Sequence, residues 1–438
     1  MTTSALAELR SQVRGRVLLT GDDDFDQARK PWNLAVQQPV SAVVEAADAD
    51  DVAAVVRYAA AAGLAVAPQP GGRGASGDVE GVILLRTGKL DELHVDAAAR
   101  SARVGAGVQG GQVQAAAGPL GLTGLPGSSP LVSVVGYTLG GGLSWFGRKY
   151  GWAADSVTAF DVVTADGTQA RVTADSDAEL FWALRGGGGD YAVVTAIEYD
   201  LHPAPTLFGG RMVWHGSQAP RVLDAFRKIT SAAPDELTVW FNMLDIPNGP
   251  WLVTLDSTFL GEEAEGRALL SALDEIEGAN ADTRGVWPMA ELGEIAHEPT
   301  EPGPSAARAE LLTDLDDKVV AALLAEPIAP LLGMNIRHLG GALARPTENP
   351  QGPLTEPYTL SMFGVPSSPE RRAEIVARQE ALVQSVAPYI SGRKPYTYLS
   401  PGDTAAAAFT PEALARLQQV KRDRDPRGVF RSNFPVLG

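Results

Sequence analysis

Three glycine-rich clusters in the first half of the chain have the residue types and spacing to bind an anionic ligand. They span residues 71–77, 136–142 and 186–189. Glycine lets consecutive backbone N–H groups converge on one point and lets a ligand pack against the main chain. Such sites bind phosphate oxygens without needing a lysine. Three of them in one region predict a long anionic cofactor that is contacted at several points, such as a dinucleotide.

An arginine lies at the centre of the first cluster. The segment "APQPGGRGASGD" covers residues 67–78, and four of the eight residues from Gly71 to Asp78 are glycine. The sequence leaves the role of Arg73 open. A guanidinium can pair with a phosphate or an acidic neighbour, stack on an aromatic ring, or point into solvent.

Several other kinds of site are excluded by composition and motif. The chain contains no cysteine, which excludes disulfides, thiolate metal sites and a cysteine nucleophile. Its five histidines are scattered and lack the spacing of metal ligands, so we expect no metal. No GxGxxG motif opens the chain after a first strand and no GxxxxGK(S/T) motif occurs, so Rossmann and P-loop assignments fail.

Charge and hydropathy restrict the partners. The 438-residue chain carries a formal net charge of −17, which repels nucleic acid and anionic lipid. No apolar run is long enough to span a membrane, and the N-terminus lacks the apolar core of an export signal. We expect a cytoplasmic protein whose partner is a small-molecule substrate, with no nucleic acid and no membrane partner. The oligomeric state stays open.

The elements around the first clusters combine helices and strands. Residues 48–63 begin with aspartate caps and stop at a glycine, which predicts an amphipathic helix. A short buried strand then leads into the first glycine loop. The segment "SVTAFDVVTADGTQARV" predicts a hairpin with its turn at "ADGT". These elements indicate an α+β domain built around the clusters.

The composition changes near Pro203. Beyond this residue, five longer strands alternate with helices at about residues 220–232, 262–278 and 369–386. This pattern indicates one antiparallel sheet with helices on one face. The segment at 296–309 is rich in proline and glycine, so we expect a loop there.

Four segments in order resemble the successive motifs of FAD-linked oxidases: "APQPGGRGASGD", "GLPGSSPLVSVVGYTLGGGLSWFGRKYG", "FWALRGGGGDYAVVTAIEYDLHP" and "VKRDRDPRGVFRSN". More narrowly, they resemble the berberine-bridge-enzyme-like branch of the vanillyl-alcohol-oxidase superfamily. The resemblance implies a two-lobed, PCMH-type FAD-binding domain at residues 1–203. It also implies a substrate-binding domain at 204–394, whose antiparallel sheet roofs the isoalloxazine ring, and a C-terminal segment at 395–438 that returns to the FAD-binding domain.

The resemblance also implies which residues contact FAD. The first loop would wrap the pyrophosphate, the second cluster would line the diphosphate and ring, and two valines and an asparagine would meet the ends of the cofactor. The implied contacts are Pro70, Gly71, Gly72, Arg73, Gly74, Ala75, Gly127, Ser128, Ser129, Val132, Ser133, Gly136, Gly140, Gly141, Val193, Val194 and Asn433.

This sequence departs from the family pattern at two positions. The family usually has a histidine after the two glycines of the first loop, bonded covalently to the flavin 8α-methyl group, and Arg73 stands there. Many members add a cysteine bonded to C6 of the flavin, and Ser129 stands in its place. Neither bond can form here, so we expect FAD to be bound non-covalently.

The resemblance further implies catalytic and substrate-contacting residues. The family's catalytic tyrosine lies in a "YxN" element, and the matching stretch "PYTYLSPGD" has Tyr396 in the tyrosine place and Tyr398 in place of the asparagine. Tyr396 would remove a proton while a hydride passes to the flavin, and it would need a partner that lowers its pKa. Trp145, Arg337, Tyr358 and Met362 are candidate substrate-pocket residues because of their places on the expected strands or beside the flavin loop.

Three functions fit these residues. The first is FAD-dependent oxidation of a lipophilic small molecule, such as a secondary metabolite. The second is a redox-neutral ring closure or cycloaddition in natural-product (polyketide) biosynthesis, with FAD retained as a structural element. The third is a ligand-binding flavoprotein without catalysis. The identity of the substrate and the electron acceptor cannot be derived from the sequence.

Overall fold

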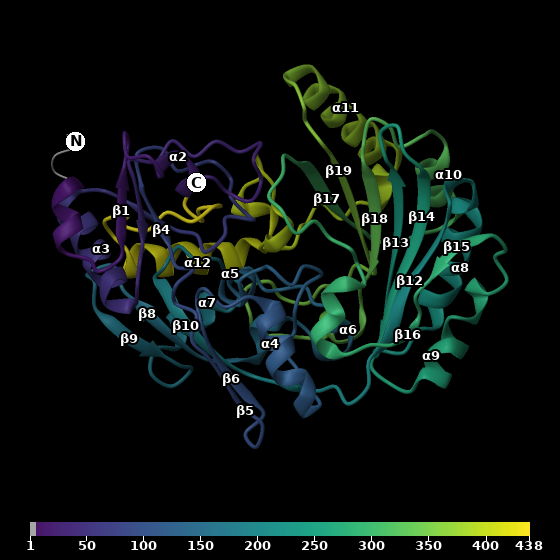
Figure 1. Ribbon diagram of the computed structural model, residues 1–438, viewed down its shortest axis with the longest axis horizontal. Coiled ribbons are helices and arrows are strands. Elements are labelled where there is room, and N and C mark those ends of the chain that lie inside the picture. Colours follow the sequence, from purple (N-terminus) through teal and green to yellow (C-terminus); the bar gives the residue numbers. More distant parts are fainter. Residues whose placement is uncertain (1–5) are drawn as a thin grey trace.

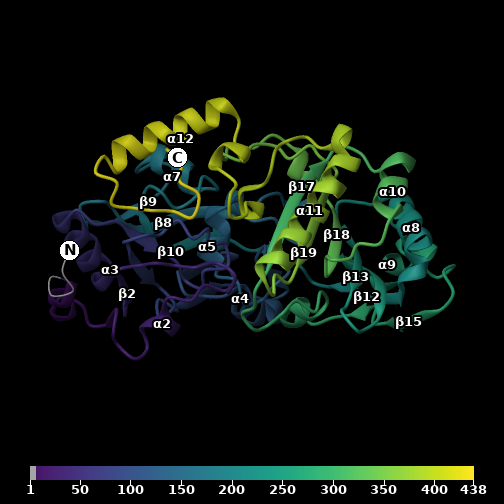
Figure 2. The same cartoon turned by 90° about the horizontal axis from the view of Figure 1, so that it is seen from above.

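The computed structural model describes residues 6–438, and these form two lobes that lie side by side (Figure 1). The first lobe contains the N-terminal half of the chain, and the second is built on one large sheet. The C-terminal helix α12 (Pro411–Arg424) lies on the first lobe, as Figure 2 shows from above. The chain therefore leaves the first lobe, builds the second and returns.

The first lobe contains two principal sheets. The strands of the smaller one are β1 (Arg16–Leu19), β2 (Ala42–Glu45), β3 (Val66–Pro68) and β4 (Ile83–Arg86), in the order β1-β2-β4-β3. The strands of the larger one are β5 (Leu93–Asp96), β6 (Ser101–Gly105), β8 (Val157–Val163), β9 (Gln169–Val172) and β10 (Val193–Asp200), in the order β5-β6-β10-β8-β9. A short pair, β7 (Leu122–Thr123) and β11 (His202–Pro203), lies apart from both.

Capping residues and a hairpin turn in the first lobe lie where the sequence predicts them. Helix α3 (Ala49–Ala62) begins at Asp48, whose side chain accepts hydrogen bonds from two backbone N–H groups, and ends at Gly63 in the left-handed conformation. The predicted capped helix is thus confirmed. The predicted hairpin is also confirmed, because β8 pairs with β9 in antiparallel register.

The glycine clusters occupy the ends of these elements. The remaining helices are α2 (Phe25–Ala28), α4 (Gly110–Ala117), α5 (Val134–Leu139), α6 (Gly147–Tyr150) and α7 (Ala178–Leu184). The first cluster follows β3, the second overlaps the end of α5, and the third follows α7. Three separate segments, each at the end of a strand or helix, therefore expose their backbone from the same lobe.

The second lobe is one antiparallel sheet of eight strands. These are β12 (Phe208–His215), β13 (Leu237–Asp245), β14 (Trp251–Phe259), β15 (Ala279–Asp282), β16 (Gly285–Val286), β17 (Ala306–Leu312), β18 (Gly333–His338) and β19 (Tyr358–Gly364). The order is β15-β12-β14-β13-β18-β19-β17, with β16 paired to β12. Helices α8 (Ala219–Ala232), α9 (Glu263–Leu269), α10 (Asp317–Leu324) and α11 (Pro369–Ser385) cover the face away from the first lobe (Figure 1). The predicted α+β fold is confirmed.

The two faces of this sheet differ in chemistry. Met243, Met334 and Met362 are neighbours across three strands and are buried in the core beneath the helices. One residue along, the row Asn242, Asn335 and Ser361 points to the opposite face, because successive side chains in a strand alternate. The helix-covered face is thus apolar and the opposite face polar.

The C-terminal segment is tied to the first lobe by buried polar contacts. Lys421 of α12 donates to the backbone carbonyls of Asp190 and Phe430 and pairs with Asp425 at 2.8 Å. The Asp190 carboxylate accepts from the N–H groups of Ser432 and Val436. These bonds fix the final residues beside the third glycine cluster.

Three expectations in the second half need correction. The helix expected at 262–278 is shorter, since α9 ends at Leu269 and a 3₁₀ turn follows at Ser271–Leu273. The expected loop at 296–309 holds the start of β17, whose alternation is hidden by the alanine and arginine residues of "AARA". The sequence patterns also did not predict α10, which follows β17. Within residues 6–438, no helix has the length and apolar character needed to cross a membrane.

Candidate functional site

A deep cleft separates the two lobes. It encloses about 1100 Å³ and is lined by residues from the first lobe, from the large sheet and helix α11 of the second lobe, and from the C-terminal tail. A site for a single small molecule is typically about 300–1,000 Å³. The cleft is therefore large enough for a long cofactor together with a second molecule.

Most of the predicted cofactor residues line this cleft. Those that line it are Pro70, Gly71, Gly72, Arg73, Gly74, Ala75, Gly127, Ser128, Ser129, Val132, Ser133, Gly136, Gly140, Val194 and Asn433. Gly141 and Val193 do not. Val193 is fully buried on β10, and a Cβ atom on Gly141 would meet Trp152 and Gln351 instead. Gly188 and Gly189 of the third cluster also line the cleft, so all three clusters reach it.

The glycines of the clusters serve two different purposes. At Gly71 no protein atom lies within 4 Å of the place where a Cβ would stand, and at Gly74 the nearest is the Asn433 amide at 3.7 Å. At Gly188 that position is 2.7 Å from the Tyr396 hydroxyl, and φ is +91°. The first loop leaves room for a ligand, whereas the third cluster makes room for a tyrosine.

Unpartnered polar atoms gather along the cleft. Seven buried side-chain atoms without a hydrogen-bond partner belong to its lining: Gln69 Oε1, Arg73 Nε, Thr87 Oγ1, Tyr137 Oη, Ser361 Oγ, Thr397 Oγ1 and Ser432 Oγ. Buried polar groups in folded proteins normally have partners, so their concentration along the cleft favours a polar ligand there. Together with the bare backbone of the first loop, these atoms suit a nucleotide cofactor such as FAD.

Arg73 makes contacts that the sequence left open. Its guanidinium stacks on Trp32, 3.7 Å from the ring centroid, and Nη2 donates to Ser129 Oγ at 2.8 Å. Burial lowers the pKa of Arg73, and the negative charge of Glu298 partly opposes this. Arg73 therefore joins the first loop to the second through the two positions at which the resemblance places covalent attachment.

The predicted catalytic tyrosines lie in the short 3₁₀ turn Tyr396–Tyr398, and both line the cleft. The Tyr396 hydroxyl donates to the Phe434 carbonyl at 3.2 Å, and its ring packs against Phe409 and Phe434. Burial and the negative charge of Asp190 hold the pKa of Tyr396 well above its usual value. Tyr396 therefore keeps its proton in this environment.

The predicted substrate residues are divided between the cleft and its support. Arg337 and Met362 line the cleft, although the Met362 side chain belongs to the core beneath the helices. Trp145 and Tyr358 do not line it. Trp145 is fully buried and stacks on Trp240, 3.2 Å between ring centroids, and Tyr358 shares a hydrogen bond with Thr230 on the helix side. Trp145 supports the wall of the cleft from behind.

Three residues that sequence reasoning missed also line the cleft. Glu298 lies in the proline-rich segment, accepts a hydrogen bond from the Ser128 hydroxyl, and approaches Arg337 Nη2 at 3.6 Å. Ser361 lies on β19, where the alternation of polar and apolar residues could have indicated it. Tyr137 follows the start of the second cluster, and no pattern distinguishes it from a core aromatic residue.

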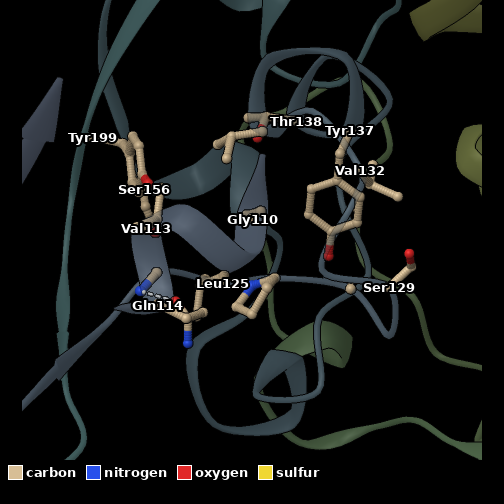
Figure 3. A pocket seen from close by; sticks show the side chains of 15 residues that line it. Gly110, Val113, Gln114, Leu125, Ser129, Val132, Tyr137, Thr138, Ser156 and Tyr199 are labelled. Carbon is tan, nitrogen blue, oxygen red and sulfur yellow. Dashed lines mark hydrogen bonds between the residues drawn. The ribbon is translucent and has the colours of Figure 1, made fainter. Parts of the chain in front are cut away.

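A second, much smaller cavity of about 30 Å³ adjoins the cleft inside the first lobe. Figure 3 shows Tyr137 on one side of it and Val113, Gln114 and Tyr199 on the other. Tyr137 and Ser129 line both spaces, and burial raises the pKa of Tyr137 well above its usual value. This cavity has room for one or two waters, so the cofactor fits the cleft and not this cavity.

Comparisons with known proteins agree with this geometry. Residues 40–173 match the model of an FAD binding domain. The chain is 27% identical to (R)-6-hydroxynicotine oxidase of Paenarthrobacter nicotinovorans over 97% of both proteins. The solved structure of 6-hydroxy-D-nicotine oxidase from Arthrobacter nicotinovorans superposes with a TM-score of 0.82 at 25% identity, covering 96% of this chain and 97% of that one. Physcomitrella patens BBE-like 1 shares the fold, with a TM-score of 0.86 at 21% identity over 98% of this chain and 99% of that one.

Proposed function

We propose that this chain, which resembles the berberine-bridge-enzyme-like family of FAD-linked oxidoreductases, binds FAD without a covalent bond and oxidises a lipophilic small molecule, such as a secondary metabolite. The observation that carries the proposal is the Arg73–Ser129 hydrogen bond. The two positions that could form covalent bonds to a flavin are occupied by residues that cannot form them and that contact each other instead.

Main-chain groups of the first lobe hold the cofactor in this proposal. The backbone N–H groups from Gly71 to Gly74 have no acceptor within residues 6–438 and line the cleft, and those of Ser129, Val132 and Ser133 are free in the same way. Val194 and Asn433 also line the cleft, and in this proposal they meet the two ends of the cofactor. FAD bound there would supply a hydride acceptor. The large sheet of the second lobe then provides the substrate side of the cleft.

The two tyrosines divide their tasks in this proposal. Tyr396 keeps its proton, bonds to Phe434 and packs against Gly140 and Gly188, so it fixes the second and third clusters relative to each other. Tyr398 also faces the cleft, and no residue between 6 and 438 forms a hydrogen bond with its hydroxyl. Tyr398 is therefore the tyrosine that remains available to a substrate.

A second function is favoured by the environment of Tyr396. A proton acceptor in an oxidation needs a pKa near the working pH, and burial moves the pKa of this hydroxyl in the opposite direction. A redox-neutral ring closure or cycloaddition, with FAD as a structural element, would not need such a base. This alternative uses the same cleft, the same cofactor contacts and a related class of lipophilic substrate.

The experiment that separates these functions follows the visible spectrum of the purified holoprotein without oxygen. Bleaching of the flavin absorption when substrate is added is the result expected for the oxidoreductase. Turnover to an isomeric product with the flavin still oxidised would establish the redox-neutral reaction instead. Tight binding of a ligand with neither bleaching nor product would identify a binding protein.

A further inference from the structure

A ladder of polar side chains crosses the cleft-facing side of the large sheet. Arg337 Nε donates to Asn335 Oδ1 at 2.9 Å, and Asn335 Nδ2 donates to Asn242 Oδ1 at 2.5 Å. Asn242 Nδ2 in turn donates to Asp256 Oδ2 at 3.2 Å. Asp256 is buried and bonded to Arg211 by two N–H groups at 2.6 and 2.7 Å. The ladder therefore runs through β18, β13, β14 and β12 and ends in a buried ion pair.

This ladder and an aromatic stack orient the Arg337 guanidinium. The guanidinium carbon lies 4.0 Å from the centroid of the Trp240 ring, and Trp240 is itself stacked on Trp145. One side of the guanidinium is occupied by the indole and Nε is occupied by Asn335. A guanidinium held in this way loses little freedom when it binds a further group, so its binding is favoured.

The remaining N–H groups of Arg337 face the cleft. The nearest carboxylate oxygen, on Glu298, is 3.6 Å from Nη2, which is longer than a hydrogen bond. Ser361 lies on the adjacent strand and on the same face as Arg337, because it pairs with Asn335 in the register. Its hydroxyl is buried and has no partner. Two sets of donors are thus available at one place on the roof of the cleft.

The charge of the cleft lining is opposite to that of the protein. The whole chain has a formal net charge of −17, but the lining contains more cations than anions. The cations are Arg73, Arg308, Arg337, Arg372 and Lys394, and the acids are Glu298 and Asp403. Arg308 and Lys394 pair with carboxylates at 2.6–3.0 Å, whereas the nearest carboxylate to Arg337, on Glu298, is 3.6 Å from Nη2 and also accepts from Ser128. On the cleft-facing side of the large sheet, the positive charge of Arg337 is therefore only weakly offset, by Glu298.

We propose that Arg337 and Ser361 form a binding subsite for an anionic oxygen of the substrate, either a carboxylate or the oxygen of an acidic enol or phenol. Arg337 donates through its terminal nitrogens, and Ser361 donates its hydroxyl. Asn335, Asn242 and Asp256 are positioning residues that act through Arg337. This inference rests on the proposed function, because it assumes the lipophilic substrate proposed there and adds that this substrate carries an acidic oxygen.

The test measures binding of simple probes to the FAD-loaded protein by isothermal titration calorimetry. Sodium benzoate represents a carboxylate, 4-nitrophenolate represents an acidic phenol, and benzamide is the neutral control. We expect at least one anion to bind about tenfold more tightly than benzamide, because a hydrogen bond to a charged group contributes about that factor or more. The anion that binds more tightly identifies the source of the oxygen.

Variants then assign the preference to the subsite. Arg337→Gln should weaken binding of the preferred anion about ten- to a hundredfold and leave benzamide binding unchanged. Ser361→Ala, which leaves the ladder intact, should weaken the anion about two- to fivefold. Arg337→Lys keeps the charge without the planar fork and should fall between wild type and Arg337→Gln. Arg345→Gln, on an exposed arginine outside the cleft, is the matched control and should change nothing.

The outcomes separate this inference from the proposed function. Equal affinity of wild type for benzamide and both anions, or an anion preference that survives in a folded Arg337→Gln protein, would overturn the subsite. Failure of the wild type to take up FAD would instead overturn the proposed function. The same titrations on the FAD-free protein would still test the subsite, because Arg337, Ser361 and the ladder all belong to the second lobe.

Discussion

The two lobes build their sides of the cleft in opposite ways. The first lobe presents main chain, with glycines where a side chain would fill the space or collide with a neighbour. The second presents side chains that stand on one face of a sheet and are fixed by hydrogen bonds to one another. The first side requires that no Cβ atom be present at its glycines, whereas the second requires its polar side-chain atoms.

This difference makes the two sides sensitive to opposite changes. In the first lobe an added methyl group is the damaging change, and in the second lobe a truncated side chain is. The comparison can therefore be tested by adding atoms to one side and removing them from the other.

The largest expected effect comes from Asp256→Ala in the second lobe. This change leaves Arg211 buried without its partner and removes the end of the polar ladder. Breaking a buried ion pair by removing one partner costs about 3–5 kcal/mol. Chemical denaturation should show a loss of that size in the free energy of unfolding.

The matched control for this prediction is Asp317→Ala. Asp317 also pairs with an arginine, Arg227, but its side chain is 92% exposed. An exposed pair contributes about 0–1 kcal/mol, so this variant should remain close to wild type. Equal losses in the two variants would show that the ladder does not depend on its buried end.

The next largest effect is expected from Gly188→Ala in the first lobe. The added Cβ would lie 2.7 Å from the Tyr396 hydroxyl, and φ at this residue is +91°. Strain of this kind costs about 1–3 kcal/mol, and displacement of the packed tyrosine adds to it. A fall of about 2–4 kcal/mol in stability, together with weaker FAD uptake, is the expected result.

Gly71→Ala is the same substitution at a position with open space. No protein atom lies within 4 Å of its Cβ, so the folded protein without cofactor should keep its stability to within about 0.5 kcal/mol. Binding of FAD should still weaken, since the methyl group stands beside the proposed pyrophosphate path. The assignment of the first loop would be wrong if FAD titration gave the wild-type affinity.

A smaller effect is expected from pH and concerns His338 on β18. Burial, with the positive charge of Arg148, holds the pKa of His338 well below its usual value, and burial also lowers the pKa of His202. Above the pKa of histidine in the unfolded chain, near 6.5, both imidazoles are neutral in the folded and in the unfolded protein. Below that pH the unfolded chain binds protons that the folded protein does not, so the folded state loses stability only as the pH falls below about 6.5. Each such histidine should lower the stability by up to about 1.4 kcal/mol per pH unit.

Denaturation at pH 7.5 and at pH 5.5 measures this effect. The free energy of unfolding of the wild type should be lower at pH 5.5 than at pH 7.5. The His338→Gln substitution should reduce this difference more than His202→Gln does. An unchanged fall in the His338→Gln protein would show that this imidazole accepts a proton in the folded state.

The same contrast explains what the sequence could predict. Helix caps, the hairpin turn and the glycine clusters are local patterns, so the α+β fold and most of the residues that line the first side of the cleft follow from short segments. The resemblance to FAD-linked oxidases was carried by these segments and is confirmed.

The second side of the cleft could not be derived in this way. The ladder joins Arg337 on β18 to Asp256 on β14 through Asn242 on β13, and only the pairing of β18 with β13, which are far apart in the sequence, places these residues in a row. Glu298 lies in a segment without periodicity, and the exclusion of Trp145 and Tyr358 from the lining depends on which face of the wall each occupies. Pairing between distant strands therefore determines this part of the site.

The most direct test of the central claim is acid precipitation of the purified protein, followed by absorption spectra of the supernatant and of the washed, redissolved pellet. The claim is that main-chain groups hold FAD with Arg73 and Ser129 at the positions where a covalent bond would otherwise form. FAD should appear in the supernatant in a molar amount equal to that of the protein. Flavin absorption that stays with the pellet would contradict it.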